Sequence, residues 1–129
     1  MAQADQHKHH QHLINELSEM LKPLFSKSSQ GIVLYLDDEH KTCNEKYAKM
    51  LGYKNVKEWE KNEYPVDDID PKDQDKAIKA FMRVSEKLET TAATGTMRKQ
   101  NGGKFKAEVT MVPLPYKGEI FVLEFFSKV

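Results

Sequence analysis

The sequence predicts an α+β fold built around one antiparallel sheet whose strands come from two separated parts of the chain. Residues 31–43 and 90–126 carry strand signals, and the segment between them carries the start, stop and periodicity signals of helices. An amphipathic segment precedes the first strand. Strands grouped in this way are typical of α+β domains rather than of alternating α/β folds. The 129 residues have the length of a single domain.

The composition narrows the classes of function. The chain holds 20 Lys and Arg against 20 Asp and Glu, and only Arg83 and Arg98 are arginines. Neutral charge and scarce arginine argue against nucleic acid as a partner, because arginine supplies the forked contacts to phosphates and guanine edges. A lone Cys43 and short apolar segments argue against disulfides, a membrane span and a signal peptide, so we expect a cytoplasmic protein without membrane contact. The sequence shows no phosphate-loop, HExxH or GxSxG motif and does not predict an enzyme.

Residues 1–12 are expected to form a flexible, histidine-rich tail, because they lack apolar periodicity. Its four histidines are His7, His9, His10 and His12. Spacings of three residues would place two imidazoles on one helix face, where they could bind Ni²⁺, Cu²⁺ or Zn²⁺. A solvated leader is the commoner explanation of such a terminus, so we predict no metal site here.

Residues 13–27 form a predicted amphipathic helix. Apolar residues recur at intervals of three and four positions, and Pro23 is expected to kink or end the helix. The apolar stripe either packs on the sheet of its own domain or forms a dimer helix, and the sequence leaves both possibilities open. The residues expected at a dimer interface are Leu13, Leu17, Met20, Leu21 and Leu24.

Two strands and two short helices are expected next. β-branched and aromatic residues indicate strands at 31–36 and 41–43. Asn44 stands directly before an apolar-periodic turn and has the residue type of an N-cap. Asn55 begins a second short helix in the same way, and this helix is expected to carry Trp59 into the core.

A longer helix and three strands complete the predicted fold. Asp70 as N-cap and Pro71 at the first helical position begin a helix that runs to about Leu88. The last three strands are expected at 90–100, 105–111 and 119–126, with turns at 101–103 and 117–118.

Three motifs, in this order, resemble the PAS family of sensor domains over about residues 28–126. They are GIVLYLDDEHKTCNEKYAKMLGY at 31–53, VDDIDPKD at 66–73 and MRKQNGGK at 97–104. The resemblance implies a PAS-like domain over 28–129, with a five-stranded antiparallel sheet, short helices on one face and a small pocket. Members of the family commonly continue into an output domain, whereas this sequence ends after the last strand, so none is expected in this chain.

The resemblance also bears on cofactors. Haem-binding members commonly use a histidine on or near the longer helix, and this chain has no histidine after His40. Members that form a flavin adduct carry a cysteine inside a helix, whereas Cys43 lies on a predicted strand, where a small buried residue is the expected role. Neither haem nor a photoactive flavin adduct is therefore expected, and the cofactor stays unknown.

The resemblance implies a non-catalytic sensory or regulatory module in signal transduction. Such a module would bind a small ligand, form a homodimer or contact a signalling-protein partner. The residues expected to line the pocket are Leu34, Ile78, Phe81, Met82, Val109, Met111, Leu123 and Phe125. For each of these residues, an ordinary place in the hydrophobic core is a commoner role than contact with a ligand, because any half-buried element needs an apolar stripe.

Two alternatives remain open. A small cone-shaped enzyme of the isomerase or dehydratase kind would need a titratable side chain deep in its cavity. Glu124 is the candidate for that role, and we expect it on the solvent face of its strand instead. The other alternative is a protein-interaction scaffold that binds no ligand.

Overall fold

The computed structural model describes residues 2–129, with side chains from residue 5 onward, and confirms the α+β class. The helices are α1 (Ala2–Met20), α2 (Lys22–Lys27), α3 (Glu45–Met50), α4 (Val56–Glu60) and α5 (Pro71–Lys87), with a 3₁₀ turn, η1, at Pro65–Asp68. The strands are β1 (Gly31–Asp37), β2 (His40–Cys43), β3 (Thr91–Arg98), β4 (Lys104–Tyr116) and β5 (Glu119–Lys128). No helix in this described part of the chain is long and apolar enough to cross a membrane.

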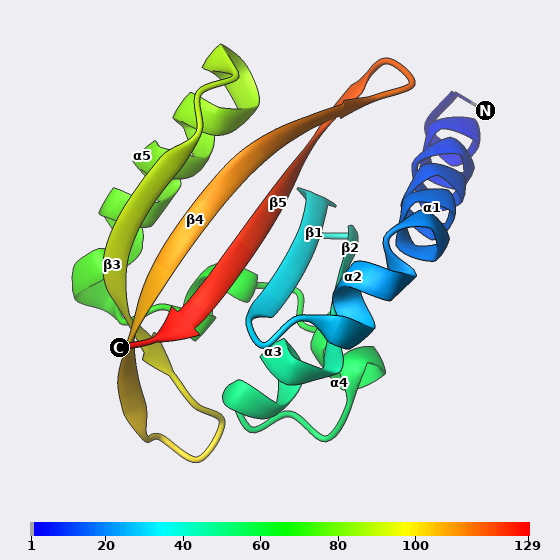
Figure 1. The fold of residues 1–129 in the computed structure, drawn as a ribbon. Coiled ribbons are helices and arrows are strands. Elements are labelled where there is room, and N and C mark those ends of the chain that lie inside the picture. Colours follow the sequence, from blue (N-terminus) through cyan, green and yellow to red (C-terminus); the bar gives the residue numbers. More distant parts are fainter. Residues whose placement is uncertain (1) are drawn as a thin grey trace.

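The five strands form one antiparallel sheet in the order β2-β1-β5-β4-β3. The first and last strands of the chain are neighbours in the middle of the sheet, where Val33 of β1 pairs with Glu124 of β5. Figure 1 shows α1 and α5 at opposite sides of this sheet. Both faces are therefore covered by helices over part of their area.

β1 is apolar on both of its faces. Ile32 and Leu34 pack in a cluster with α1, which we call the outer face of the sheet. Val33 and Tyr35 point the other way, because successive side chains of a strand alternate, and they pack with the helices that follow β2. We call this second side the inner face. A strand covered on both faces shows a continuous apolar run instead of an alternating pattern.

α1 extends through residues 2–12, so the expected flexible tail is wrong for this segment. Met1 lies outside the described residues. The N-terminal half of α1 lies against the β1–β2 turn, where His7 and His10 meet His40. Apolar periodicity could not predict this half of the helix, because histidines make its contacts with the domain.

The apolar stripe of the N-terminal helix packs on the sheet of its own domain, which was one of the two possibilities. Leu13 and Leu17 are 1% and 3% exposed and belong to the outer-face cluster, and Leu21 is half-buried against it. Met20 and Leu24 remain 63% and 39% exposed. Of the five residues expected at a dimer interface, these two are the ones left at the surface.

Asn44 is the N-cap of α3, as predicted, and it also joins three other segments. Its Oδ1 accepts hydrogen bonds from the backbone N–H of Tyr47 at 3.0 Å and of Ile32 at 2.9 Å. Its Nδ2 donates to the carbonyl oxygens of Gln30 at 3.0 Å and of Phe25 at 3.2 Å. The side chain is buried with all four hydrogen-bonding positions used, so it ties α2 and the following loop to β1 and α3.

The other predicted helix starts are confirmed. Asn55 accepts a hydrogen bond from the backbone N–H of Glu58 at 2.9 Å, and Asp70 accepts one from Lys72 at 3.1 Å. Trp59 is buried, as expected from its place in α4.

Candidate functional site

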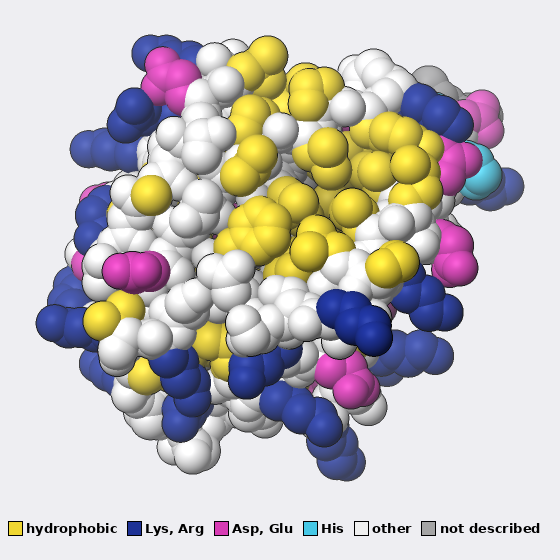
Figure 2. All heavy atoms as spheres, viewed as in Figure 1, with side chains coloured by type: hydrophobic (Ala, Val, Ile, Leu, Met, Phe, Trp, Pro, Cys, Tyr) yellow, Lys and Arg dark blue, Asp and Glu magenta, His cyan; other side chains and the backbone are white. Residues whose placement is uncertain are grey.

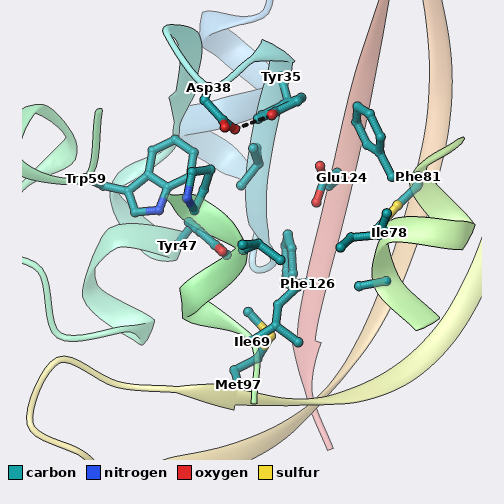
Figure 3. Close-up of a pocket in the computed structure, with 15 residues that line it drawn as sticks. Tyr35, Asp38, Tyr47, Trp59, Ile69, Ile78, Phe81, Met97, Glu124 and Phe126 are labelled. Atoms are coloured by element: carbon teal, nitrogen blue, oxygen red, sulfur yellow. Dashed lines mark hydrogen bonds between the residues drawn. The ribbon is translucent and has the colours of Figure 1, made fainter. Parts of the chain in front are cut away.

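A cavity of about 150 Å³ lies between the inner face of the sheet and the helices α4 and α5. A smaller compartment of about 50 Å³ continues beneath α5 and shares wall residues with it. Figure 3 shows the lining side chains converging from the sheet on one side and the helices on the other. The walls are mainly apolar and include Trp59, Ile69, Ile78, Phe81, Met97 and Phe126.

The cavity exists because α5 packs loosely on the sheet. Of the residues of α5, all of which the structure describes, Val84 is the one that is buried. The facing positions around the smaller compartment are small: Ala77 and Ala80 on the helix and Gly95 on β3. Close-packed interiors leave few voids larger than a water molecule, so this space is a specific feature of the domain.

Glu124 projects from the middle of β5 into the cavity, so the expectation that it faces solvent is wrong. Its neighbours across the sheet are Val33 and Met111, both apolar. Burial raises the pKa of the Glu124 carboxyl to about 8, and no hydrogen bond or ion pair from another described residue opposes this effect. At neutral pH this side chain is therefore mainly an uncharged carboxylic acid, which can both donate and accept a hydrogen bond.

Two tyrosines add hydroxyl groups to the lining. The Tyr35 hydroxyl donates a hydrogen bond to Asp38, and its ring packs edge-on against Phe81 with centroids 5.1 Å apart. The Tyr47 hydroxyl makes no hydrogen bond with a described residue, and Figure 3 shows it and the Glu124 carboxyl directed into the cavity. Burial, assisted by nearby carboxylates, raises the pKa of Tyr47 well above its ordinary value, so this hydroxyl stays protonated.

A buried hydrogen-bond network holds the Trp59 wall in place. Asp68 accepts a hydrogen bond from the Trp59 indole N–H at 2.9 Å and another from the Tyr53 hydroxyl at 2.6 Å. Burial raises the pKa of Asp68, and the two donors partly offset that effect. Both donors are satisfied by one carboxylate, which fixes the ring plane of Trp59 at the edge of the cavity.

Four of the eight predicted pocket residues lie at the cavity. Ile78, Phe81 and Met111 line the main cavity, and Val109 lines the smaller compartment. Ile78 is 46% exposed, so it lies at the rim rather than at the floor.

The other four predicted pocket residues are wrong. Leu34, Leu123 and Phe125 belong to the outer-face cluster with α1, on the opposite side of the sheet. Met82 is 45% exposed on α5 and borders neither compartment. The three strand positions were assigned to the wrong face because both faces of β1 and β5 carry apolar residues, so the pattern does not distinguish them.

The polar lining was predicted only in part, because Glu124 was named as the candidate for a titratable group in a cavity but was expected on the solvent face. Glu124 interrupts the otherwise apolar segment EIFVLEFF, and a charged residue in the middle of a central strand is a signal that could have placed it in the cavity. Tyr47 gave no such signal, because a tyrosine on a short helix is ordinary core.

Cys43 and the histidines are placed outside the cavity. Cys43 is buried on β2, as expected, and burial raises the pKa of its thiol far above the ordinary value. His7 and His10 lie close to His40, with carboxylates nearby, in an arrangement that could hold a metal ion.

The comparisons with known proteins identify the fold. No protein-family model matches the sequence, and no curated protein matches it at a significant level. Solved structures do match. A domain of a sensory box sensor histidine kinase/response regulator from Geobacter sulfurreducens is 22% identical with a TM-score of 0.64, and the match covers 85% of this chain and 92% of that one.

Two further solved structures, both of PAS domains, match the fold of this chain. A PAS domain from Colwellia psychrerythraea is 14% identical with a TM-score of 0.67, over 88% of this chain and 97% of that one. The third match is the PAS domain of a LuxR-family transcriptional regulator from Burkholderia thailandensis, which was solved in complex with ethanol. It is 18% identical with a TM-score of 0.62, and the match covers 84% of this chain and 96% of that one. The protein thus has the PAS fold.

Proposed function

We propose that this protein is a non-catalytic sensory module of signal transduction whose cavity binds a small molecule. One observation carries the proposal: an apolar cavity contains a carboxyl and a hydroxyl group that the described residues leave without hydrogen-bond partners. A pocket with apolar walls and a few convergent polar groups is the usual form of a small-molecule site. The structural neighbours include a domain of a sensor kinase and a domain solved with ethanol, which supports the proposal of a sensory module that binds a small molecule.

The size and chemistry of the cavity define the ligand class. An apolar cavity of ~150 Å³ holds a molecule of about the size of benzene. Glu124 and Tyr47 can each exchange a hydrogen bond with a hydroxyl or amine group of that molecule. The proposed ligand is therefore a compact, mainly apolar molecule with one such group.

The first test is to examine the protein as purified. Native mass spectrometry should show the chain carrying one small molecule, which denaturation releases, and an absorption spectrum should show whether that molecule is a chromophore. If only the unliganded mass is found, and the probes described next do not bind, the cavity does not serve as a ligand site.

Phenol and toluene probe the role of Glu124. Replacing Glu124→Leu should weaken phenol binding by about tenfold, because one hydrogen bond to the ligand is lost, and should leave toluene binding unchanged or tighter. Calorimetric titration measures both affinities. Glu108→Leu, at an exposed position on the neighbouring strand, is the control and should change neither. Equal effects of the two variants on phenol would contradict the proposed site.

We further propose that the module forms a homodimer through its N-terminal helices and the outer face of the sheet. Met20 and Leu24 are exposed next to half-buried Leu21 and Phe125, and Figure 2 shows apolar side chains gathered on this face of the molecule. A second copy would offer the same patch in return, as a two-fold interface requires.

Light scattering tests the homodimer. The wild-type chain should have twice the 14.9 kDa mass of one chain, and Met20→Ser combined with Leu24→Ser should give the monomer mass. Tyr64→Ser removes an equally exposed apolar side chain, 63% as for Met20, elsewhere on the molecule and should leave the dimer intact. A monomeric wild-type protein, or a dimer that survives the double substitution, would exclude this interface.

Glu124 also favours a second candidate function, namely proton transfer on a bound carbonyl compound. Its raised pKa, about 8, suits a general acid or base near neutral pH. Proton NMR in D₂O with cyclohexanone as probe tests this function. Exchange at the carbons next to the carbonyl should exceed the buffer rate and be lost in Glu124→Gln, whereas exchange at the buffer rate excludes the enzyme.

A further inference from the structure

A cluster of histidines and carboxylates lies where α1 meets the β1–β2 turn, away from the cavity. His7 Nδ1 on α1 is 2.8 Å from His40 Nε2 on β2. The same His7 nitrogen is 3.8 Å from a carboxylate oxygen of Glu39 in the turn. His40 Nδ1 is 2.7 Å from Asp37 Oδ1. Two segments 33 residues apart thus place three potential ligand atoms side by side.

Asp37 determines which nitrogen of His40 is available. Its Oδ1 accepts hydrogen bonds from the backbone N–H of Glu39 at 3.0 Å and of His40 at 2.8 Å, so this acceptor is held in place by the turn. Because a carboxylate oxygen accepts, we assign the proton of neutral His40 to Nδ1, which donates to the same oxygen and leaves the lone pair of Nε2 facing His7. A carboxylate that accepts from one ring nitrogen while the other faces a cation is the usual support of a metal-binding histidine.

We propose that His7 Nδ1, His40 Nε2 and the Glu39 carboxylate bind a divalent transition-metal ion such as Zn²⁺. Two imidazoles, one carboxylate and an open position for water form a ligand set that Zn²⁺ takes, whereas Ca²⁺ and Mg²⁺ take oxygen ligands. A hydrogen bond between His7 Nδ1 and His40 Nε2 at 2.8 Å requires a proton between the two nitrogens, and a bound ion would take the place of that proton.

The geometry needs only a small adjustment. Tetrahedral ligands at Zn–N distances of ~2.05 Å lie about 3.3 Å apart, so the two ring nitrogens must separate by about half an ångström. The His7 side chain is 54% exposed on a helix and the Glu39 side chain is 78% exposed, so both can move by this amount. The His40 side chain is 5% exposed and serves as the fixed point.

The other histidines of α1 differ in their surroundings. His10 borders the cluster with its ring edge-on to His40, and its shielded Nε2 has no hydrogen-bond partner among the described residues, with Glu119 the nearest carboxylate at 3.4 Å. His9 and His12 are exposed, and they belong neither to the group of His7, Glu39 and His40 nor to the adjacent group of His10, Asp37 and His40. A site built from the cluster can therefore be distinguished from chelation by the histidine-rich segment alone.

Titration of the full chain with ZnCl₂ against a chromophoric competing chelator tests the site. The wild-type protein should bind one Zn²⁺, and zinc should raise its melting temperature. His7→Ala and Glu39→Gln should each weaken zinc binding by about tenfold or more, because each removes one metal ligand. Both side chains are exposed, so we expect the variants to fold as the wild type does. The double variant His9→Ala, His12→Ala is the control and should bind as the wild type does.

Two results would overturn the proposal. If Glu39→Gln and His40→Gln both bind zinc as the wild type does, the ligands lie within α1 alone. If the His9, His12 control loses as much affinity as His7→Ala, the histidine-rich segment binds metal without the turn. Circular dichroism of each variant shows that it is folded, so a loss of binding is assigned to the ligands. A wild-type chain that binds no zinc also refutes the site.

Discussion

Replacing Glu124 by Gln is expected to stabilise the protein strongly at alkaline pH and hardly at all at acidic pH. The carboxyl has a pKa of about 8 in the folded protein, against an ordinary value of 4.5. Between these values the folded state holds a proton that the unfolded chain has released, so the free energy of unfolding of the wild type falls as pH rises, up to about pH 8. The full shift corresponds to about 5 kcal/mol as an upper bound. Glutamine has no proton to lose and avoids this penalty.

Urea unfolding of both proteins near pH 5 and near pH 9 measures this difference, because other titrating groups cancel between wild type and variant. Glu108→Gln replaces an exposed carboxylate on β4 and should change stability little at either pH. A Glu124→Gln variant that is equally stable to wild type at both pH values would mean that the carboxyl is ionised and solvated in the folded protein.

Replacing Asn44 by Ala should lower the free energy of unfolding by about 3–5 kcal/mol. The substitution removes a helix cap and leaves the backbone N–H of Ile32 and the carbonyls of Gln30 and Phe25 without their side-chain partner. Buried polar groups left unpaired cost more than the bonds themselves contribute. We therefore expect a far larger loss than a cap alone provides.

Asn55 provides a matched comparison for Asn44. It is also an N-cap, but its side chain makes one hydrogen bond, to Glu58, at an exposed position. Asn55→Ala should cost about 1 kcal/mol. Urea unfolding of the two variants measures the difference. Losses of equal size would show that Asn44 acts only as a cap, and that the join between α2, β1 and α3 depends on other contacts.

Local signals accounted for most of the fold. Asn44, Asn55 and Asp70 were recognised as helix starts because capping depends on residue type and on the few residues that follow it. The hairpin turns at 101–103 and 117–118 were recognised for a similar reason, since glycine there adopts positive φ at Gly102 and Gly118. These features are decided over a handful of neighbouring residues.

The pocket depended on information that the sequence pattern does not contain. Leu34 and Leu123 were expected in the cavity, whereas Val33 and Glu124 line it. A strand shows which residues alternate, but when both faces are apolar it does not show which set faces which layer. The packing of α1 decides it, because α1 covers the outer face of the sheet and α5 covers the inner face.

The sequence by itself determined the class of fold, the order of its elements and the residues that begin its helices. Only the tertiary structure decided that the Glu124 carboxyl lies in the cavity without a partner among the described residues, that Asn44 joins four segments, and that His7 meets His40. The physical reason is the distance along the chain over which each effect acts. Propensity and capping act between residues close in sequence, whereas burial and long-range contacts depend on distant segments that are brought together only by folding.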